Sequence, residues 1–159
     1  MSEHRKLNGL DEYSTAIDEV IGLAEREISI FDFSLENLGF NSQQRFEKLQ
    51  EFLRANPENR LRIVVHDAGY LEKRCPRMLT LLKLFSHGME IRRTAPELLH
   101  VYDPFCLADS EHYARRFHFD DPRGLCARSD PHEGHGLKLR FMQLLDGSEE
   151  VLFGDTTGL

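Results

Sequence analysis

The chain has 159 residues, of which 40% are hydrophobic and 30% charged, and its formal net charge is −7. This length is typical of one domain with a buried core. The acidic balance argues against nonspecific nucleic-acid binding, which depends on Lys and Arg contacts to phosphates. No apolar run approaches the roughly 20 residues that a membrane span needs. We therefore expect one domain at residues 1–148, followed by a polar tail at 149–159.

The cysteines and the first residues of the chain bear on its compartment. Cys75, Cys106 and Cys126 are too few and too scattered for a disulfide framework, and no two of them form a Cys-x-x-Cys pair. The opening sequence Met-Ser-Glu-His-Arg-Lys lacks the apolar segment of a secretory signal. These features predict a cytoplasmic protein with reduced cysteines, no membrane association and no cofactor.

The first half of the chain alternates helical and strand patterns. Apolar residues recur at steps of three and four over residues 10–24, which predicts a helix as the first element. Residues 27–33 have apolar side chains on both faces of a predicted strand. A second helix is expected from the N-cap candidate Asn41-Ser42 to just before Asn56-Pro57, and residues 61–65 form the next buried strand.

The alternation continues for one more helix and strand. Pro76 is suited to the first turn of a helix, and Gly88 to its C-terminal cap. Residues 89–93 then form a third strand. The repeated order of helix and strand, with connections of this length, favours a parallel sheet flanked by helices.

The pattern changes after Pro96. Residues 105–109 and 112–119 are separated by two turn residues, which predicts a hairpin added to the sheet. Residues 120–136 are rich in Asp, Pro, Gly and His and are expected to form an irregular loop, followed by a closing helix that begins at Leu137. The predicted fold is α/β: a mixed, mostly parallel sheet flanked by helices, with a C-terminal hairpin.

The order of elements over residues 10–148 resembles one half of a phospholipase D-type domain, the repeat that carries a His-x-Lys-x4-Asp motif. The segment around His100 is the chemically specific part of the likeness. His100 takes the histidine position, but Tyr102 stands at the lysine position and Leu107 at the aspartate position, and Asp109 lies two residues late. The chain is most similar to a bacterial branch of degenerate phospholipase D-like domains.

The resemblance implies a site that two copies of the motif complete across a twofold axis, so that a single repeat acts as a homodimer. In that family one histidine attacks phosphorus, the other protonates the leaving group, and two lysines hold the phosphoryl oxygens. Tyr102 can offer only a neutral hydrogen bond, and loss of one oxyanion donor commonly lowers a rate about 100- to 1000-fold. We therefore expect a pseudoenzyme that acts as a binding or interaction module.

Eight polar residues are the candidates for ligand binding at the expected cleft. They lie on the motif segment, on the hairpin that follows it, and at the end of the second buried strand: His100, Tyr102, Asp109, Arg116, His118, Asp120, His66 and Asp67. Ligands of open parallel sheets bind beyond the carboxyl ends of the strands, where Asp32 and Thr94 are also expected. The predicted partner is an anionic, phosphate-containing small molecule or another protein.

Other interpretations stay open. His100 could act as a nucleophile with Arg116 in place of the lysine, which would make the protein a divergent phosphodiesterase or phosphotransferase. The charged residues of 115–123 could instead form a salt-bridged, exposed face. An unrelated α/β regulatory module would lack the added hairpin.

Metal and phosphate sites elsewhere have weaker support. His66 and Asp67 have no second His-Asp pair at ligand spacing, and the spacing of Cys126, His132 and His135 matches no standard zinc site. We therefore predict no metal site. Arg92 and Arg93 alternate along a strand, so at most one of them is expected in any one cleft.

Overall fold

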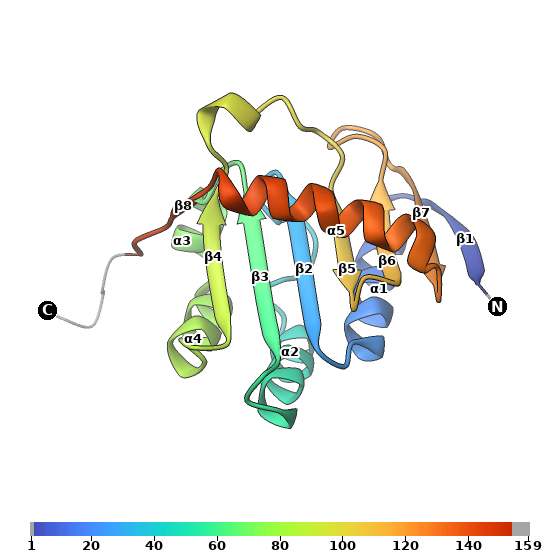
Figure 1. Ribbon diagram of the computed structural model, residues 1–159. Helices are drawn as coiled ribbons and strands as arrows, with labels where there is room; N and C mark the ends of the chain where they lie inside the picture. The colour runs from blue at the N-terminus through green and yellow to red at the C-terminus, as the bar shows by residue number, and fades with distance from the viewer. Residues whose placement is uncertain (1, 154–159) are drawn as a thin grey trace, which may run out of the picture.

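The structure, a computed structural model, describes residues 2–153, which form one mixed sheet between two layers of helices. Within these residues the sheet has eight strands in the order β1-β7-β6-β5-β2-β3-β4-β8. Helices α1 to α4 cover one face, and α5 crosses the other face (Figure 1). The predicted α/β class with a mixed sheet and flanking helices is confirmed. The sheet is not mostly parallel, however, because five of the seven strand pairings within residues 2–153 are antiparallel.

Three parallel strands form the centre of the sheet. These strands and the helices that join them are β2 (Glu27–Asp32), α2 (Gln43–Ala55), β3 (Arg60–Val65), α3 (Gly69–Arg74), α4 (Pro76–Leu84) and β4 (Met89–Arg93). Within the described residues, parallel pairing is limited to β2 with β3 and β3 with β4. All three strands therefore end at the same edge of the sheet.

The remaining strands extend the sheet by antiparallel pairing. They are β1 (Glu3–Asn8), β5 (Phe105–Ala108), β6 (His112–Arg116), β7 (Arg123–Arg128) and the short β8 (Glu149–Glu150). β5 lies antiparallel to β2, and β5 and β6 form the predicted hairpin. Because β5 runs against β2, the segment that precedes β5 lies at the carboxyl ends of the parallel strands.

The two faces of the sheet are packed by separate apolar clusters. On one side α1 (Leu10–Leu23) buries the stripe that its periodicity predicts, including Ile17 and Val20. On the other side α5 (Pro131–Asp146) packs Phe141 and Leu144 against Phe31 of the sheet. Since both faces are covered at the centre, the strands carry near-continuous apolar runs.

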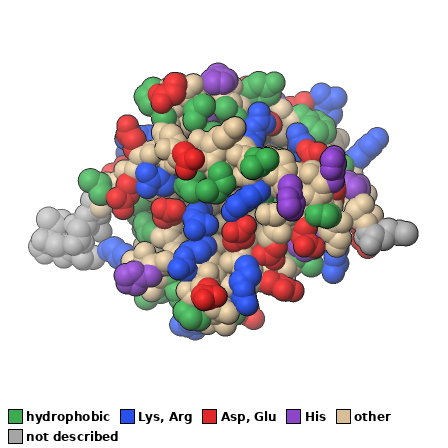
Figure 2. Space-filling model, viewed as in Figure 1, with side chains coloured by type: hydrophobic (Ala, Val, Ile, Leu, Met, Phe, Trp, Pro, Cys, Tyr) green, Lys and Arg blue, Asp and Glu red, His purple; other side chains and the backbone are tan. Residues whose placement is uncertain are grey.

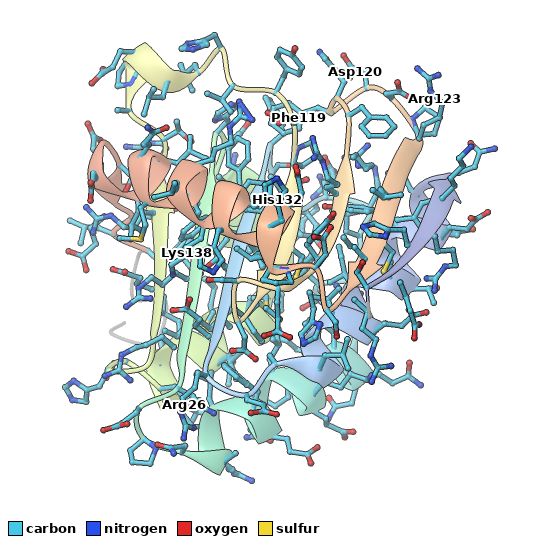
Figure 3. All side chains as sticks on the ribbon, turned by 45° about the vertical axis from the view of Figure 1, so that its right-hand side comes forward. Arg26, Phe119, Asp120, Arg123, His132 and Lys138 are labelled. Carbon is cyan, nitrogen blue, oxygen red and sulfur yellow. The ribbon has the colours of Figure 1, made fainter. Side chains whose placement is uncertain are left out.

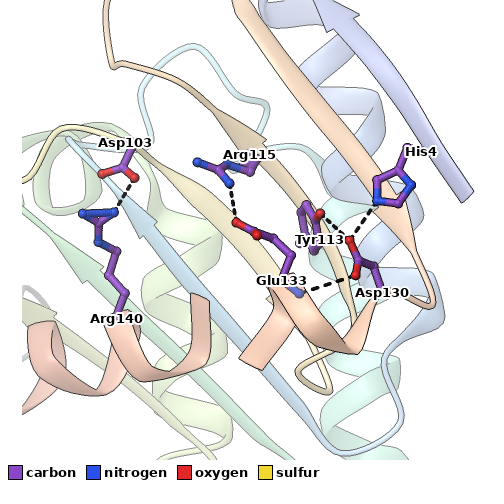
Figure 4. A network of polar contacts seen from close by, with 7 residues as sticks. All are labelled: His4, Asp103, Tyr113, Arg115, Asp130, Glu133 and Arg140. Atoms are coloured by element: carbon purple, nitrogen blue, oxygen red, sulfur yellow. Dashed lines mark hydrogen bonds and ion pairs between the residues drawn. The ribbon is translucent and has the colours of Figure 1, made fainter. Parts of the chain in front are cut away.

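Polar contacts also hold α5 on the sheet. Asp130 accepts hydrogen bonds from His4 and Tyr113 while it caps the helix, Glu133 pairs with Arg115, and Arg140 pairs with Asp103 (Figure 4). These contacts join the helix to β1, to β6 and to the segment before β5. They set the position of α5 across the sheet.

The part of this face that α5 leaves uncovered is charged. Basic side chains there are interspersed with acidic ones (Figure 2). Arg62 lies 3.3 Å from Glu90, and Lys138 lies 2.9 Å from Glu27. Ion-paired side chains, rather than an apolar layer, therefore border and cover this part of the face. Within residues 2–153 no helix is both long and apolar enough to cross a bilayer.

Several elements differ from the sequence-based expectations. The first element is the strand β1, not a helix; five of its six residues are exposed, so it lacks an apolar alternation. The helix α3 was not predicted. α4 ends at Leu84 with Phe85 as its C-cap, so Gly88 is not the cap.

The predicted loop over residues 120–136 is wrong, because it contains β7 and the first turns of α5. Glycines that suggested a loop are required by close backbone approaches. A Cβ at Gly124 would collide with the backbone oxygen of Arg115 in the neighbouring strand, and one at Gly134 with the oxygen of Ser110. Asp130 and Pro131 are the N-cap and first residue of α5, which is their favoured role.

The C-terminal boundary predicted at residue 148 does not coincide with an end of the sheet. Glu149–Glu150 form β8 and pair with β4, and Val151 and Phe153 pack against the core. The rest of the predicted tail, residues 154–159, lies outside the described residues.

Candidate functional site

The carboxyl ends of the central strands bring polar side chains together inside the protein. Asp32 ends β2, His66 follows β3 and Thr94 follows β4, and all three are buried. Arg116, the last residue of β6, is buried beside them. We call these four residues the polar edge.

Both ring nitrogens of His66 are held by the protein. Nε2 lies 2.6 Å from the backbone oxygen of Val101, and Nδ1 lies 2.8 Å from the hydroxyl of Thr94. Burial lowers the pKa of His66. A carbonyl oxygen can only accept, so Nε2 donates to Val101. The Thr94 hydroxyl also lies 3.1 Å from the backbone oxygen of Val65, so its single hydrogen serves either that oxygen or His66 Nδ1. Neither nitrogen is left for a substrate.

Asp32 and Arg116 form a buried ion pair with loose geometry. Arg116 Nη2 lies 3.8 Å from Asp32 Oδ1, and the guanidinium stacks over the ring of Tyr13. Asp32 Oδ2 accepts hydrogen bonds from the backbone of the turn that follows, the shorter one from Leu35 N at 2.7 Å. Burial raises the pKa of Asp32, although Leu35 and Arg116 oppose the shift. Asp32 therefore neutralises the buried cation of this edge.

Aromatic rings divide the space around the polar edge. The rings of Phe33 and Phe119 lie 5.5 Å apart in an edge-to-face arrangement, and His66 packs against both. Phe119 and Asp120 lie at the tip of the turn between β6 and β7, near Arg123 (Figure 3). Two hollows result, and Phe33 lines both.

The larger hollow, which we call the edge cleft, has a volume of about 770 Å³. Among the residues that line it are His66, Asp67, Lys73, Arg93 and Leu99. The smaller hollow, which we call the inner pocket, has a volume of about 300 Å³. It lies between the start of α1 and the β6–β7 turn, and its lining includes Asp32, Arg116, Phe119 and Asp120.

The motif segment contributes little to either hollow. His100 is exposed, and no hydrogen bond within residues 2–153 involves its imidazole. Tyr102 is also exposed and stacks on His118 with ring centroids 4.7 Å apart. His118 in turn accepts a hydrogen bond from the backbone of Asp120. The structure thus joins Tyr102, His118 and Asp120 in one surface group and leaves His100 without an orienting partner.

Asp109 lies at the opposite end of the sheet from the other candidates, where β5 ends and β2 begins. Its carboxylate accepts hydrogen bonds from three consecutive backbone N–H groups, those of Glu25, Arg26 and Glu27, at 2.7 to 3.0 Å. The predicted role of Asp109 at the ligand site does not fit this position. Asp109 anchors the loop that leads into β2.

Other charged residues of the segment 115–123 are held in ion pairs. Arg115 contacts Glu133 of α5 at 2.6 Å, and Arg123 contacts Asp121 at 2.8 Å. The hydrogen bonds from Arg123 lower the pKa of Asp121 to about 2. β6 ends at Arg116, and the alternation of side chains between the two faces of the strand stops there. Arg116 and His118 therefore do not share a strand face. This geometry agrees with the salt-bridged alternative for the segment 115–123.

The residues weighed for metal binding or for phosphate are placed separately. Cys126 packs on the α1 side of the sheet, whereas His132 lies on α5 on the other side (Figure 3). No group of three or more potential metal ligands occurs within the described part of the chain. Arg92 hydrogen-bonds to Ser148, while Arg93 lines the edge cleft.

Four residues of the site were not identified from the sequence. Phe33 and Phe119 were taken as strand residues, but both lie beyond the ends of their strands, where Phe33 is exposed and Phe119 is partly buried. Lys73 lies on the helix α3, which was not predicted. Tyr13 was assigned to the apolar stripe of α1, where it is indeed buried, but its ring also supports Arg116.

Solved structures of phospholipase D proteins share this fold. The chain superposes on the phospholipase D family member Nuc from Salmonella typhimurium with a TM-score of 0.67 and 10% identity, covering 95% of this chain and 99% of that one. NucT from Helicobacter pylori gives 0.62 and 8%, covering 95% and 100%. Phosphatidylserine synthase from Haemophilus influenzae gives 0.60 and 14%, covering 94% of this chain and 40% of that one.

At the level of sequence, no curated protein matches the chain. Residues 9–152 match a family described as "Domain of unknown function (DUF7931)". This match includes the polar edge, the edge cleft and the inner pocket. The chain therefore belongs to the DUF7931 family and has a phospholipase D-like fold.

Proposed function

We propose that this domain is a catalytically inactive phospholipase D-like module that binds a ligand in the edge cleft. The observation that carries the proposal is the hydrogen bonding of two histidines, His66 and His100. His66 uses both nitrogens within the protein, and His100 has no partner within the described residues to orient it as a nucleophile. Tyr102, at the lysine position, is stacked on His118 and supplies no positive charge to a phosphoryl oxygen.

We further propose that the ligand carries a single anionic group, such as one phosphate. Lys73 and Arg93 are the cations that line the edge cleft, whereas Arg116 lines the inner pocket. Arg93 also pairs with Glu149 at 3.3 Å on the surface, so an anion would have to compete with that carboxylate. The carboxylates of Asp67, Glu72 and Glu150 line the same cleft. A polyanion such as nucleic acid is disfavoured by these three negative charges.

The absence of catalysis is tested with bis(p-nitrophenyl) phosphate. We expect no release of nitrophenol above the buffer rate from the native protein, because Tyr102 supplies no positive charge and His100 has no hydrogen-bond partner within residues 2–153. Hydrolysis that disappears in His100→Ala would overturn the proposal and favour the alternative, a divergent phosphodiesterase or phosphotransferase.

Anion binding is tested by calorimetric titration with inorganic phosphate and with phenyl phosphate. Lys73→Met and Arg93→Gln should each weaken binding several-fold, because each removes one cation from the cleft. Lys48→Met changes an exposed cation on α2 and serves as the matched control. Equal affinity in all four proteins would place the anion elsewhere.

We also propose a homodimer formed through the same edge of the sheet. Large apolar side chains are exposed there: Phe33 at 47%, Leu99 at 50%, Tyr102 at 52% and Phe117 at 45%. Adjacent exposed apolar residues are typical of an interface. Sedimentation equilibrium should show a dimer that Leu99→Asp weakens, whereas Leu139→Asp, on the exposed side of α5, should leave it intact. A strict monomer would remove this part of the proposal.

A further inference from the structure

Two residues that line the inner pocket each have a buried polar atom without a hydrogen-bond partner. Within residues 2–153, Asp32 Oδ1 and Arg116 Nε are the buried side-chain nitrogen or oxygen atoms left in this state. Both residues are more than nine-tenths buried. Buried polar groups are nearly always paired, so two exceptions at one place need an explanation.

The two atoms are chemically complementary. The other oxygen of Asp32 is bonded to the backbone of Leu35, and Arg116 Nη1 donates to the backbone oxygen of Phe119 at 2.9 Å. Of the buried atoms without a hydrogen bond, one is an acceptor, Asp32 Oδ1, and one is a donor, the Nε–H group of Arg116. Arg116 Nη2 lies 3.8 Å from Oδ1, too far for a hydrogen bond. Because the carboxylate and the guanidinium neutralise each other, the group that satisfies both atoms has a donor and an acceptor and no net charge.

The walls of the pocket restrict the shape of this group. Leu10, Phe33 and Phe119 line the pocket beside the ion pair, and Leu10 and Phe33 are exposed to solvent. The rings of Phe33 and Phe119 meet edge to face, which presents flat apolar surfaces. A volume of about 300 Å³ is sufficient for one ring with a polar substituent.

We propose that the inner pocket binds a planar amide, either a carboxamide on a ring or the amide-like edge of a nitrogen heterocycle. Its N–H group donates to Asp32 Oδ1, and its carbonyl oxygen accepts from Arg116 Nε–H. Both protein atoms are covered in the present conformation, so the ligand displaces part of the turn at residues 119–121. Phe33 separates the inner pocket from the edge cleft. Amide binding in the inner pocket is therefore independent of the phosphate binding proposed for the edge cleft.

The inference is tested by nuclear magnetic resonance on the ¹⁵N-labelled full chain with benzamide, benzoate and acetophenone as matched probes. Benzamide should shift the Arg116 Nε–H resonance and the backbone resonances of residues 119–121. Benzoate lacks the donor and adds a charge, and acetophenone lacks the donor, so each should bind at least about tenfold more weakly.

Variants locate the binding. Arg116→Lys keeps the charge but removes the Nε donor, and it should weaken benzamide binding about tenfold. Phe33→Ala alters an exposed wall, tests the same pocket if the lysine variant fails to fold, and should also weaken binding. Arg54→Lys, an exposed arginine in the last turn of α2 and far from the pocket, is the matched control and should bind benzamide normally. Lys73→Met and Arg93→Gln should also bind benzamide normally, which separates this site from the edge cleft.

Three results would overturn the inference. The first is the absence of any shift of the Arg116 Nε–H resonance at millimolar benzamide. The second is equal affinity for benzamide and benzoate. The third is a crystal structure grown with benzamide in which an ordered water alone bridges Asp32 Oδ1 and Arg116 Nε.

Discussion

The two ends of the sheet use a buried or half-buried aspartate in different ways. At the end where β2 begins, Asp109 accepts three backbone hydrogen bonds. At the end where β2 finishes, Asp32 leaves one oxygen without a hydrogen bond, and its cation lies 3.8 Å away. The first end is built to hold backbone in place, whereas the second retains unsatisfied polar groups beside two hollows. Two aspartates that are distant in the chain therefore serve a structural end and an end that we propose binds a ligand, which we call the ligand-facing end.

The largest expected effect comes from breaking the ion pair at the ligand-facing end. Arg116→Met leaves the Asp32 carboxylate buried without a cation and should lower the free energy of unfolding by about 3 to 5 kcal/mol. Urea denaturation measures the loss. The double variant Asp32→Asn, Arg116→Met also removes the unpaired carboxylate, so it should regain much of the free energy of unfolding that Arg116→Met loses. A loss below about 1 kcal/mol in Arg116→Met would show that the ion pair is solvated.

At the structural end, Asp109→Ala should lower the free energy of unfolding by about 2 to 3 kcal/mol. The variant loses the acceptor of three backbone N–H groups and also places alanine at a φ of 53°, a left-handed conformation that aspartate and asparagine tolerate better. Asp109→Asn keeps this conformation and one acceptor oxygen, so its loss should be smaller. If urea denaturation gave equal losses for Asp109→Ala and Asp109→Asn, the one acceptor oxygen and the backbone conformation that asparagine keeps would contribute nothing to stability.

A smaller effect is expected from pH at the ligand-facing end. Burial lowers the pKa of His66, so the folded protein binds this proton less readily than the unfolded chain. The stability that His66 contributes is therefore complete above the unfolded pKa of about 6.5 and is lost as the pH falls through the folded pKa. As the pH is lowered from 7.5 to about 5, the free energy of unfolding should fall less steeply for His66→Gln than for the native protein. Identical slopes of unfolding free energy against pH for the two proteins would contradict this expectation.

The smallest effect is expected at the surface of the same end. Tyr102→Ala removes a ring that is about half exposed and stacked on His118, so the free energy of unfolding should fall by less than about 1 kcal/mol. The melting temperature should fall by less than about 4 °C. Tyr102→Phe retains the stack and is the control. A larger loss would show that the motif segment supports the fold.

The central elements were predictable because their signals are local. The helical stripe of α1 and the apolar runs of β2 and β3 follow from residues a few positions apart. β1 and β7 were missed because pairing partners, not local patterns, make them strands. Gly124 suggested a loop, yet it lies in β7, where the backbone of β6 leaves no room for a side chain.

For the site, the strand order implied a cleft beyond the carboxyl ends of β2, β3 and β4, and it placed Asp32, His66 and Thr94 along one edge. It could not show that both nitrogens of His66 are bonded, since Val101 comes from a segment with no regular secondary structure. Nor could it show that Phe33 and Phe119 meet across that edge.

The sequence by itself determined the α/β class and the edge of the sheet at which polar groups gather, because periodicity and chain direction are local properties. Only the tertiary structure decided that Asp109 serves the far end and that Arg116 is paired with Asp32. Those contacts join segments distant in the chain. They depend on where β5 and β6 end, and no local pattern of residues encodes that.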